Sequence, residues 1–259
     1  MHLSNIFTYP IKSTHPISLE SGFLFTEGVG LDRHWMVVDE NNAMVTSRKQ
    51  PKLLHIATKV AGDQLKVMLP EQTFSIPLVP KPSNAIMVAH WGEDLLTSWP
   101  QNAALDDALS HYLGSKCSLV YSASLQLNDG AKSLSFADAQ PVLLTTTSSL
   151  LALNERLREP VGMDRFRANL VVNNEIADVE DDWQLIRVGE CELQVTYPCE
   201  RCVLTTIDPK LLRPHPQQEP LRTLATYRRL PKGGVGFGIN LTVTKPGPIN
   251  VGDPVEVLR

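Results

Sequence analysis

The sequence predicts a mainly β fold with a few helices, in the α+β class. Short β-branched and apolar runs recur at close spacing and are separated by Gly, Pro, Asn and Asp, whereas only three segments have helical spacing. Many short strands with few helices favour a barrel or a sandwich over a doubly wound parallel sheet. The sequence contains no internal repeat and no low-complexity tract.

The expected strands follow one another along most of the chain. Residues 35–38 and 43–46 predict a hairpin around the polar turn at residues 40–42, and residues 55–60 and 65–69 predict a second hairpin that turns at Gly62. Further strands are expected at residues 85–89, 118–121, 170–172, 193–196, 239–244 and 255–258.

The three expected helices begin near polar caps or proline. Residues 105–112 have helical spacing between a candidate N-cap at Asn102 and Gly114, where the pattern stops. The other two helices are expected at residues 150–157, after Ser148 or Ser149, and at residues 220–224, with Pro220 in the first turn.

Composition is typical of a soluble globular protein. The 259 residues, 42% of them hydrophobic, suffice for one large or two small domains. A net charge of -4 argues against a nucleic-acid partner. Four cysteines do not make a disulfide framework, which points to a reducing compartment. Because no signal-peptide pattern and no membrane-length apolar run is present, we expect a cytoplasmic protein with no membrane partner.

The motif Cys199-Glu200-Arg201-Cys202 combines two thiols with a guanidinium. A thiolate is a soft ligand for transition metals, and a nearby cation stabilises it. Structural zinc needs four protein ligands, and neither a second CxxC nor a close histidine pair follows the motif. A thioredoxin-like dithiol opens a helix, whereas residues 203–207 are β-branched and are expected to be extended. Two buried cysteines without chemistry remain an alternative.

Cationic residues in expected loops and strand ends form a second candidate set. An organic cofactor with a terminal phosphate needs such donors, because Arg pairs oxygens bidentately and Lys supplies a point charge. Taken singly, each is more often a solvated surface charge. The set comprises Lys12 beside Ser13, Arg33, Arg48 beside Ser47, Arg165 and Arg167.

Several short motifs, in their order along the chain, resemble the MOSC-domain family, and within it the branch of the mitochondrial amidoxime reducing component and its bacterial relatives. They include the cysteine motif with its Thr-Thr-Ile-Asp-Pro run, and the segments at residues 9–13, 30–35, 44–48 and 251–255. The resemblance covers nearly the whole chain. It implies two β-barrel-like domains, a MOSC N-terminal β-barrel domain at residues 1–120 and a MOSC domain at residues 121–259, with the cofactor cleft between them. The polar segment 122–135, with its Asn128-Asp129-Gly130 turn, agrees with a boundary in this region.

The resemblance also implies a cofactor, molybdenum-molybdopterin, whose pyranopterin dithiolene supplies sulfur ligands. The second cysteine of the family motif binds the metal, which corresponds to Cys202. Arg201 is expected either to stabilise that thiolate or to pair with a carboxylate across the barrel. Thr147 and Ser148, which lie ahead of the second expected helix, correspond to cofactor contacts of the family, and a role as plain N-caps is an equal alternative for both. The residues that correspond to cofactor contacts are Lys12, Ser13, Arg33, Arg48, Thr147, Ser148, Arg167 and Asn169.

The activity implied by the resemblance is reduction of small N-hydroxylated substrates, namely amidoximes, hydroxylamines and N-hydroxy base analogues. The metal takes the oxygen from nitrogen, and two electrons with two protons release water. Electrons are expected from a separate electron-transfer protein or reductase, because no ferredoxin-type cysteine cluster follows residues 252–254. The main alternative is a non-redox carrier of molybdenum cofactor or persulfide sulfur, and a ligand-binding barrel without metal is a third.

Overall fold

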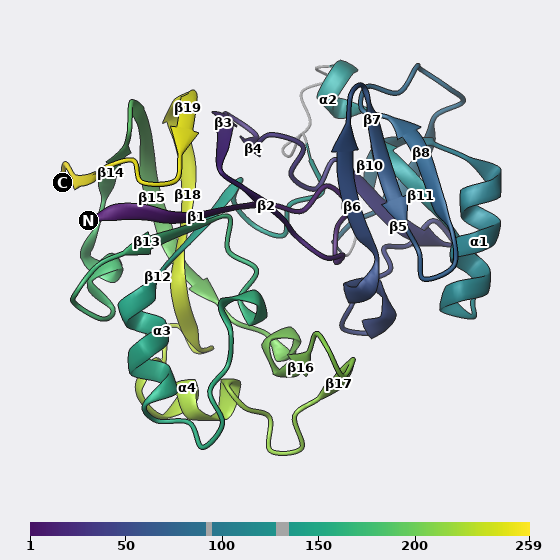
Figure 1. Cartoon of the computed structure of the whole chain (residues 1–259). Coiled ribbons are helices and arrows are strands. Elements are labelled where there is room, and N and C mark those ends of the chain that lie inside the picture. Colours follow the sequence, from purple (N-terminus) through teal and green to yellow (C-terminus); the bar gives the residue numbers. More distant parts are fainter. Residues whose placement is uncertain (92–94, 128–134) are drawn as a thin grey trace. The chain divides into compact units, whose positions relative to one another are not determined.

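The computed structural model describes residues 1–91, 95–127 and 135–259 (Figure 1). The predicted Asn128-Asp129-Gly130 turn lies outside these residues. The chain forms two compact units. The first unit consists of residues 1–8, 18–30 and 139–259, and the second unit consists of residues 9–17 and 31–138. The predicted mainly β fold with few helices is confirmed.

An eight-stranded mixed sheet forms the centre of the first unit, in the order β2-β1-β13-β12-β18-β15-β14-β20 (Figure 1). Strands β12 and β13 run parallel, whereas β12 with β18 and β15 with β18 run antiparallel. The strands are β1 (His2–Thr8), β2 (Ile17–Leu19), β12 (Val142–Thr146), β13 (Leu170–Asn173), β14 (Leu185–Val188), β15 (Cys191–Glu200), β18 (Gly236–Lys245) and β20 (Val255–Val257).

Two smaller sheets complete the strands of this unit. One contains β3 (Ser21–Phe25), β4 (Gly28–Val29) and β19 (Gly247–Asn250), and the other pairs β16 (Ile207–Asp208) with β17 (Arg213–Pro214). The helices are α3 (Thr147–Asn154) and α4 (Leu221–Tyr227), and three 3₁₀ helices are η2 (Met163–Arg165), η3 (Val179–Asp182) and η4 (Val203–Thr206).

The first unit has two apolar cores. The larger core is built from alternate residues of the eight-stranded sheet, such as Leu144 and Leu241, which are fully buried. The smaller core joins α3 and α4 to β18 and includes Phe166 and Phe237, whose rings stack at a centroid distance of 3.9 Å. Next to this smaller core, the backbone N–H of Arg201 donates to Val235 O at 2.7 Å, which ties the cysteine motif to the segment just before β18.

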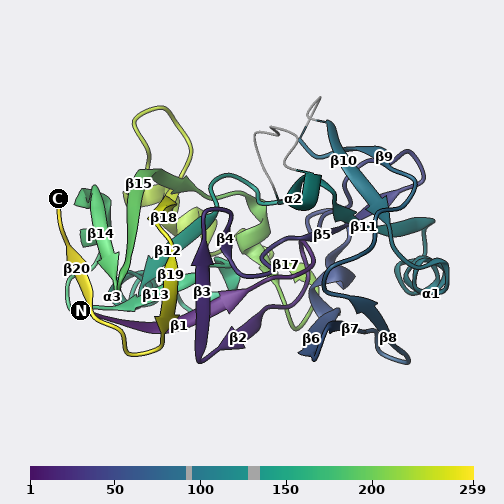
Figure 2. The ribbon, with the colours of Figure 1, turned by 90° about the horizontal axis from the view of Figure 1, so that it is seen from above.

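The second unit contains a four-stranded and a three-stranded sheet, which Figure 2 shows from above. The first has the order β5-β11-β10-β9, from β5 (Trp35–Asp39), β9 (Ile86–Ala89), β10 (Leu95–Pro100) and β11 (Cys117–Ser122). The second contains β6 (Ala57–Ala61), β7 (Gln64–Met68) and β8 (Thr73–Pro77). The helices are α1 (Ala103–Leu113), α2 (Ser124–Leu127) and the 3₁₀ helix η1 (Pro51–His55). No helix in the described parts of the chain is long and apolar enough to cross a membrane.

Most predicted elements are confirmed. The second predicted hairpin is β6 and β7, which turn at Gly62. Helix α1 begins after Asn102, whose side chain accepts from the backbone N–H of Leu105, and it ends at Gly114 in the left-handed conformation. The first predicted hairpin does not form a second strand, because residues 43–46 make only isolated bridges, Met44 with Val38 of β5 and Ala43 with Ala89 of β9. The six further predicted strands all overlap observed strands.

Two predictions near the candidate site were wrong. Helix α3 begins at Thr147 after an N-cap at Thr146, earlier than the expected start after Ser148 or Ser149. Residues 203–206 form the 3₁₀ helix η4 in place of the expected strand. The hydroxyl of Thr205 donates to Cys202 O at 3.0 Å, and the hydroxyl of Thr206 donates to Val203 O at 2.7 Å. These local bonds stabilise the turn and override the β propensity of the segment.

Candidate functional site

Cys202 is the exposed member of the four cysteines, while Cys199 is half-buried. It lies between β15 and η4 with an extended backbone, at φ −104° and ψ 176°. The other two, Cys117 and Cys191, are buried, and burial raises the pKa of both thiols. Since a thiol must be reachable and ionised to bind a metal, Cys202 is the sulfur best placed to do so.

Arg201 lies between the two motif cysteines and contacts Cys199. Its Nη1 donates to the Cys199 sulfur at 2.9 Å, and its Nη2 donates to Phe166 O at 2.7 Å. The guanidinium also lies 5.6 Å from the centre of the Phe166 ring. Across the described ranges, no carboxylate pairs with Arg201, and its buried Nε has no hydrogen-bond partner. One guanidinium thus fixes the motif against the smaller core.

Arg165 braces the turn that follows Cys202. Its Nη1 donates to Thr205 O at 3.3 Å, and its Nη2 pairs with Asp208 at 3.0 Å. Burial opposes ionisation of Asp208, but backbone N–H donors from Leu211 and Lys210 and the charge of Arg165 outweigh it, so the pKa of this carboxyl is lowered. Arg165 therefore ties η2 to η4 through its hydrogen bond with Thr205 and to β16 through its ion pair with Asp208.

Arg167 and Asn169 follow η2 and lead into β13. Arg167 is buried and has a left-handed backbone, at φ 55°. The Asn169 amide joins two strands, since its Oδ1 accepts from the backbone N–H of Leu143 at 3.1 Å and its Nδ2 donates to Phe7 O at 3.3 Å. Asn169 thus has a structural role in the sheet, whatever else it contacts.

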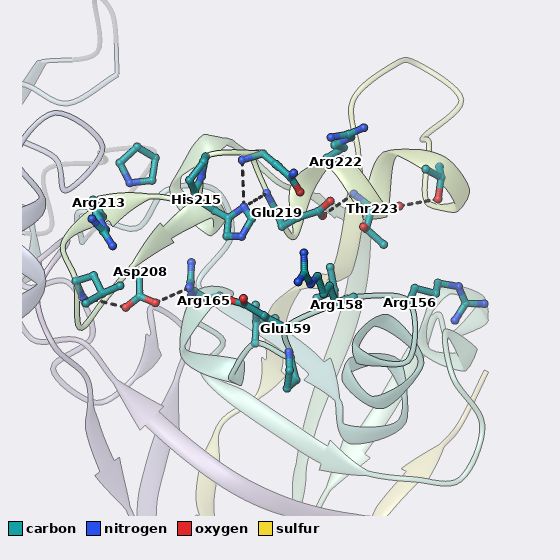
Figure 3. Close-up of a pocket in the computed structure, with 18 residues that line it drawn as sticks. Arg156, Arg158, Glu159, Arg165, Asp208, Arg213, His215, Glu219, Arg222 and Thr223 are labelled. Carbon is teal, nitrogen blue, oxygen red and sulfur yellow. Dashed lines mark hydrogen bonds and ion pairs between the residues drawn. The ribbon is translucent and has the colours of Figure 1, made fainter.

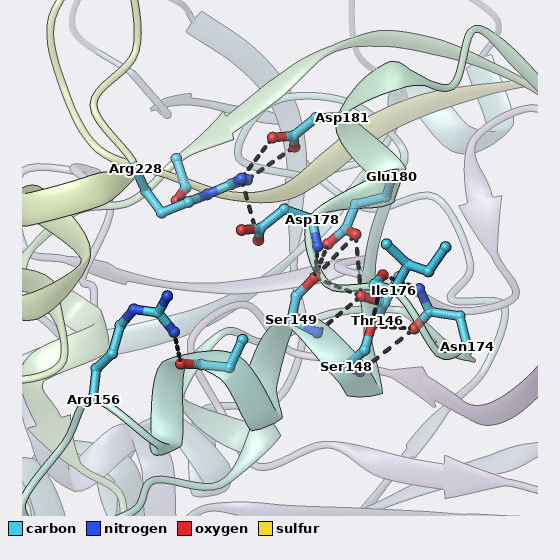
Figure 4. A network of polar contacts seen from close by, with 12 residues as sticks. Thr146, Ser148, Ser149, Arg156, Asn174, Ile176, Asp178, Glu180, Asp181 and Arg228 are labelled. Atoms are coloured by element: carbon cyan, nitrogen blue, oxygen red, sulfur yellow. Dashed lines mark hydrogen bonds and ion pairs between the residues drawn. The ribbon is translucent and has the colours of Figure 1, made fainter.

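The hydroxyls of Thr147 and Ser148 are engaged by neighbouring groups, as Figure 4 shows for Ser148. Thr147 donates to the Asn173 side chain at 2.9 Å. Ser148 donates to the Asn174 side chain at 2.5 Å and to Ile176 O at 2.9 Å. Neither residue is the N-cap of α3. Their side chains link the start of the helix to the segment after β13.

The start of α3 also faces a carboxylate of the protein itself (Figure 4). Glu180 on η3 is fully buried and accepts from the hydroxyl of Thr146 at 3.1 Å and from the hydroxyl of Ser149 at 2.8 Å. Burial raises the pKa of Glu180. Glu180 therefore occupies the N-terminal end of α3, between the N-cap residue Thr146 and Ser149.

In the second unit, the fold gathers Lys12 and Arg48 around Trp91. Lys12 is buried, and its Nζ donates to Phe136 O at 2.7 Å and pairs with Asp138 at 2.5 Å. The Lys12 Nζ lies 5.3 Å and the Arg48 guanidinium 4.7 Å from the centre of the Trp91 ring. Two cations thus share one indole.

Arg33 lies in the same unit, paired with Asp32 and 4.3 Å from the centre of the Tyr9 ring. Burial disfavours its charge, but Asp32, Tyr9 and Asp138 more than compensate, so the pKa of the guanidinium is raised. Asp138 therefore acts on both Arg33 and Lys12.

Three of the predicted cofactor contacts have a left-handed backbone, a conformation that is unfavourable in residues other than glycine. They are Ser13 at φ 70°, Arg33 at φ 54° and Arg167 at φ 55°. Such strain persists where the surroundings impose it, and it concentrates at ligand clamps and active sites. Five further non-glycine residues in the described chain share this conformation, so it supports a functional role for these three only together with their polar or charged side chains.

Two buried donors beside the predicted cations have no hydrogen-bond partner among the residues that the structure describes. They are the Ser47 hydroxyl, next to Arg48 in the chain, and Nε1 of Trp91. Buried polar groups are normally paired, so these donors suit the acceptor oxygens or nitrogens of a bound group. The sequence offered no motif for Trp91, and only the fold brings it to Lys12. Outside residues 92–94 and 128–134, no group of three or more His, Cys, Asp or Glu side chains is placed to hold a metal ion.

Comparison with known proteins confirms the predicted family resemblance. The family model described as "MOSC N-terminal beta barrel domain" matches residues 1–116, and the model described as "MOSC domain" matches residues 131–256. The Xenopus laevis protein named mitochondrial amidoxime-reducing component 1 is 31% identical over 98% of this chain and 81% of its own length. The human protein of that name is 27% identical over 99% of this chain and 82% of its own length. The molybdenum cofactor sulfurase of Oryza sativa subsp. japonica is 28% identical over 93% of this chain and 32% of its own length.

Proposed function

This chain belongs to the MOSC family, and we propose that it is a molybdenum-cofactor-dependent reductase of N-hydroxylated compounds such as amidoximes and hydroxylamines. The observation that carries the proposal is the exposed thiol of Cys202 at the second position of the cysteine motif. The names of the amidoxime-reducing relatives, which align with nearly the whole chain, support the same reaction class. We assign the electrons to a separate redox protein.

Cys202 is the proposed thiolate ligand of molybdenum. When bound, the cofactor supplies oxygen-atom abstraction from nitrogen, which no side chain can perform. The protein's own part is to hold the thiolate and orient it. The η4 turn, closed by Thr205 on the Cys202 carbonyl and braced by Arg165, fixes the backbone that presents the sulfur. Arg201 holds the other motif cysteine in place.

Lys12, Ser13, Arg33 and Arg48 are the proposed cofactor contacts of the second unit. Cations and unpaired buried donors suit a phosphate and the polar edge of a pterin, and Lys12 with Arg48 supplies the charge while Ser47 and Trp91 supply free N–H and O–H groups. Buried cations act strongly because little water screens them.

Arg167, Asn169, Thr147 and Ser148 are the proposed contacts of the first unit. The left-handed backbone of Arg167 favours its assignment. The case for Thr147 and Ser148 as cofactor contacts is weaker, because both hydroxyls already donate hydrogen bonds to neighbouring groups. Each would have to give up that partner to bind the cofactor.

A second candidate is a carrier of molybdenum cofactor or persulfide sulfur. The observation that favours it is the match of a molybdenum cofactor sulfurase over 93% of this chain. An exposed Cys202 serves either chemistry, since both require a reachable sulfur.

Turnover with an artificial electron donor separates the two candidates. Protein produced in a host that makes molybdenum cofactor is supplied with reduced viologen and benzamidoxime, and benzamidine is counted per bound molybdenum. A reductase gives many turnovers, whereas a carrier gives at most one. Cys202→Ala abolishes activity, while the matched Cys199→Ala variant retains most of it. Single turnover, together with transfer of cofactor or sulfur to an apo-enzyme, would replace the reductase with the carrier.

A further inference from the structure

The first unit contains a pocket of about 800 Å³ (Figure 3). It is lined by the segment that follows α3, by η2, by the segment from β16 to residue 219, and by α4. Neither Cys202 nor any of the predicted cofactor contacts lines it. The volume falls in the range of small-molecule sites.

The charge of the pocket is opposite to that of the chain. Five arginines line it, against the three carboxylates of Glu159, Asp208 and Glu219, which leaves an excess of positive charge in a chain whose net charge is -4. The arginines are Arg156, Arg158, Arg165, Arg213 and Arg222. A concave site lined by one sign of charge concentrates ligands of the opposite sign.

Two of the three carboxylates already have partners within the protein. Asp208 pairs with Arg165 at 3.0 Å, and Glu219 accepts from the backbone N–H of Thr223 at 3.0 Å at the start of α4. In contrast, the guanidinium groups of Arg158, Arg213 and Arg222 make no ion pair or hydrogen bond with any residue that the structure describes. These three cations are available to a ligand.

His215 adds a donor of fixed orientation. Its Nδ1 accepts from the backbone N–H groups of Gln217 at 3.2 Å and Glu219 at 3.4 Å. A ring nitrogen that accepts carries no proton, so the neutral imidazole bears its proton on Nε2 and donates from there. Figure 3 shows His215 and Glu219 on one side of the pocket and Arg158 with Glu159 on the facing side.

Apolar groups line the rest of the pocket. Leu157, Val161 and Leu211 contribute side chains, and Pro160 and Pro214 contribute rings. An inorganic anion would leave this surface and most of the volume unused. A ligand with an anionic end and an apolar body would use both.

We propose that this pocket binds a small organic phosphate. The phosphate lies between Arg158 and Nε2–H of His215, which face each other across the pocket (Figure 3), because guanidinium pairs phosphate oxygens bidentately. Arg213 and Arg222 lie apart from each other in the lining and add positive charge that attracts the anion. The apolar body lies against Leu157 and Val161. None of the proposed molybdenum contacts lines this pocket, although it shares Arg165 and Asp208 with the brace on the turn after Cys202.

Calorimetric titration of the cofactor-free full-length chain with 1-naphthyl phosphate tests the proposal. We expect saturable binding of one molecule per chain, and weaker binding of inorganic phosphate and of 1-naphthol. Arg158→Gln and His215→Gln should each weaken binding by about tenfold, the usual effect of one charge-assisted hydrogen bond, whereas Arg213→Gln and Arg222→Gln should each have a smaller effect. Arg229→Gln, which removes an exposed arginine outside the pocket, should leave the affinity unchanged.

Three outcomes would overturn the proposal. One is the absence of saturable binding to the wild-type chain at millimolar 1-naphthyl phosphate. Another is an unchanged affinity in Arg158→Gln and His215→Gln, each with a native unfolding midpoint. The third is equal affinity for inorganic and naphthyl phosphate, which would remove the organic part of the assignment.

Discussion

Arg201 donates from Nη1 to the sulfur of Cys199 at 2.9 Å, although Cys202 is its immediate neighbour in the chain. The guanidinium is held in that direction by its second bond, to Phe166 O at 2.7 Å. The two thiols of one short motif therefore have different surroundings. Cys199 is half-buried with a cationic partner, and Cys202 is exposed.

The four cysteines should react with iodoacetamide in a defined order. Cys202 is exposed and should be alkylated first. Cys199 should react second because it is half-buried. Cys117 and Cys191 are buried with a raised pKa, and should react only on unfolding. Peptide mass spectrometry of the native, cofactor-free protein over time measures the order. Labelling of Cys117 as fast as that of Cys202 would contradict the structure.

Lys12→Met and Arg48→Gln should each reduce retention of the pterin cofactor by about tenfold or more. Each change removes a charge-assisted contact worth roughly 1.5–3 kcal/mol. Pterin fluorescence after oxidation, per mole of purified protein, measures retention. The matched control is Lys59→Met, which removes an exposed lysine of β6 in the same unit. Equal retention in Lys12→Met and the control, with both proteins folded, would argue against a cofactor contact at Lys12.

Burial of His34 should make the protein less stable in acid. Burial lowers the pKa of His34 to about 4. In the unfolded chain His34 has a pKa near 6.5 and therefore binds a proton at a higher pH than it does in the folded chain. The stability of the fold is thus full above about pH 6.5 and falls as the pH drops toward 4. The free energy of unfolding in urea, measured across this range, should lose part of its acid dependence in His34→Gln. His111→Gln, which changes an exposed histidine on α1, should keep the wild-type profile.

Glu180 should have the opposite pH dependence. Its folded pKa is raised, so its contribution to stability is full below the unfolded value of about 4.5 and is lost as the pH rises through the folded pKa. Replacement of the carboxylate by an amide removes this loss. Glu180→Gln should therefore gain stability relative to wild type between pH 5 and pH 8, with the exposed Glu175→Gln as control. A stability difference that does not vary with pH would contradict a buried, titrating Glu180.

A helix or strand could be predicted from the sequence where signals close by in the chain determine it. Helix α1 could be predicted because its cap at Asn102 and its stop at Gly114 are both local. The η4 turn could not, because two threonine hydroxyls bond back along the chain where their β-branched shape favoured a strand. Strand β1 was not predicted, since a register shift between Leu3 and Asn5 breaks its alternation.

The residues of the candidate site could likewise be predicted only in part. Cys202 and the cationic residues carry their chemistry in the sequence. Trp91, which lies against two of these cations, and Glu180, which fills the start of α3, reach their positions only through contacts between distant segments. Residue type thus indicated the cations but gave no sign of the groups that surround them.

The division of the first unit into three chain segments sets the order in which it can be completed during synthesis. Strand β1 leaves the ribosome well before its partner β13, which follows only after the second unit, and Ser4 bonds to Val171 across 167 positions. At roughly 5–20 residues per second, the edge of β1 that pairs with β13 stays unpaired on the order of ten seconds or longer, while its other edge can pair with β2 at once. The second unit can meanwhile fold from residues 9–17 and 31–138. Nascent chains stalled before and after β13 should therefore differ sharply in their dependence on chaperones that protect unpaired strands.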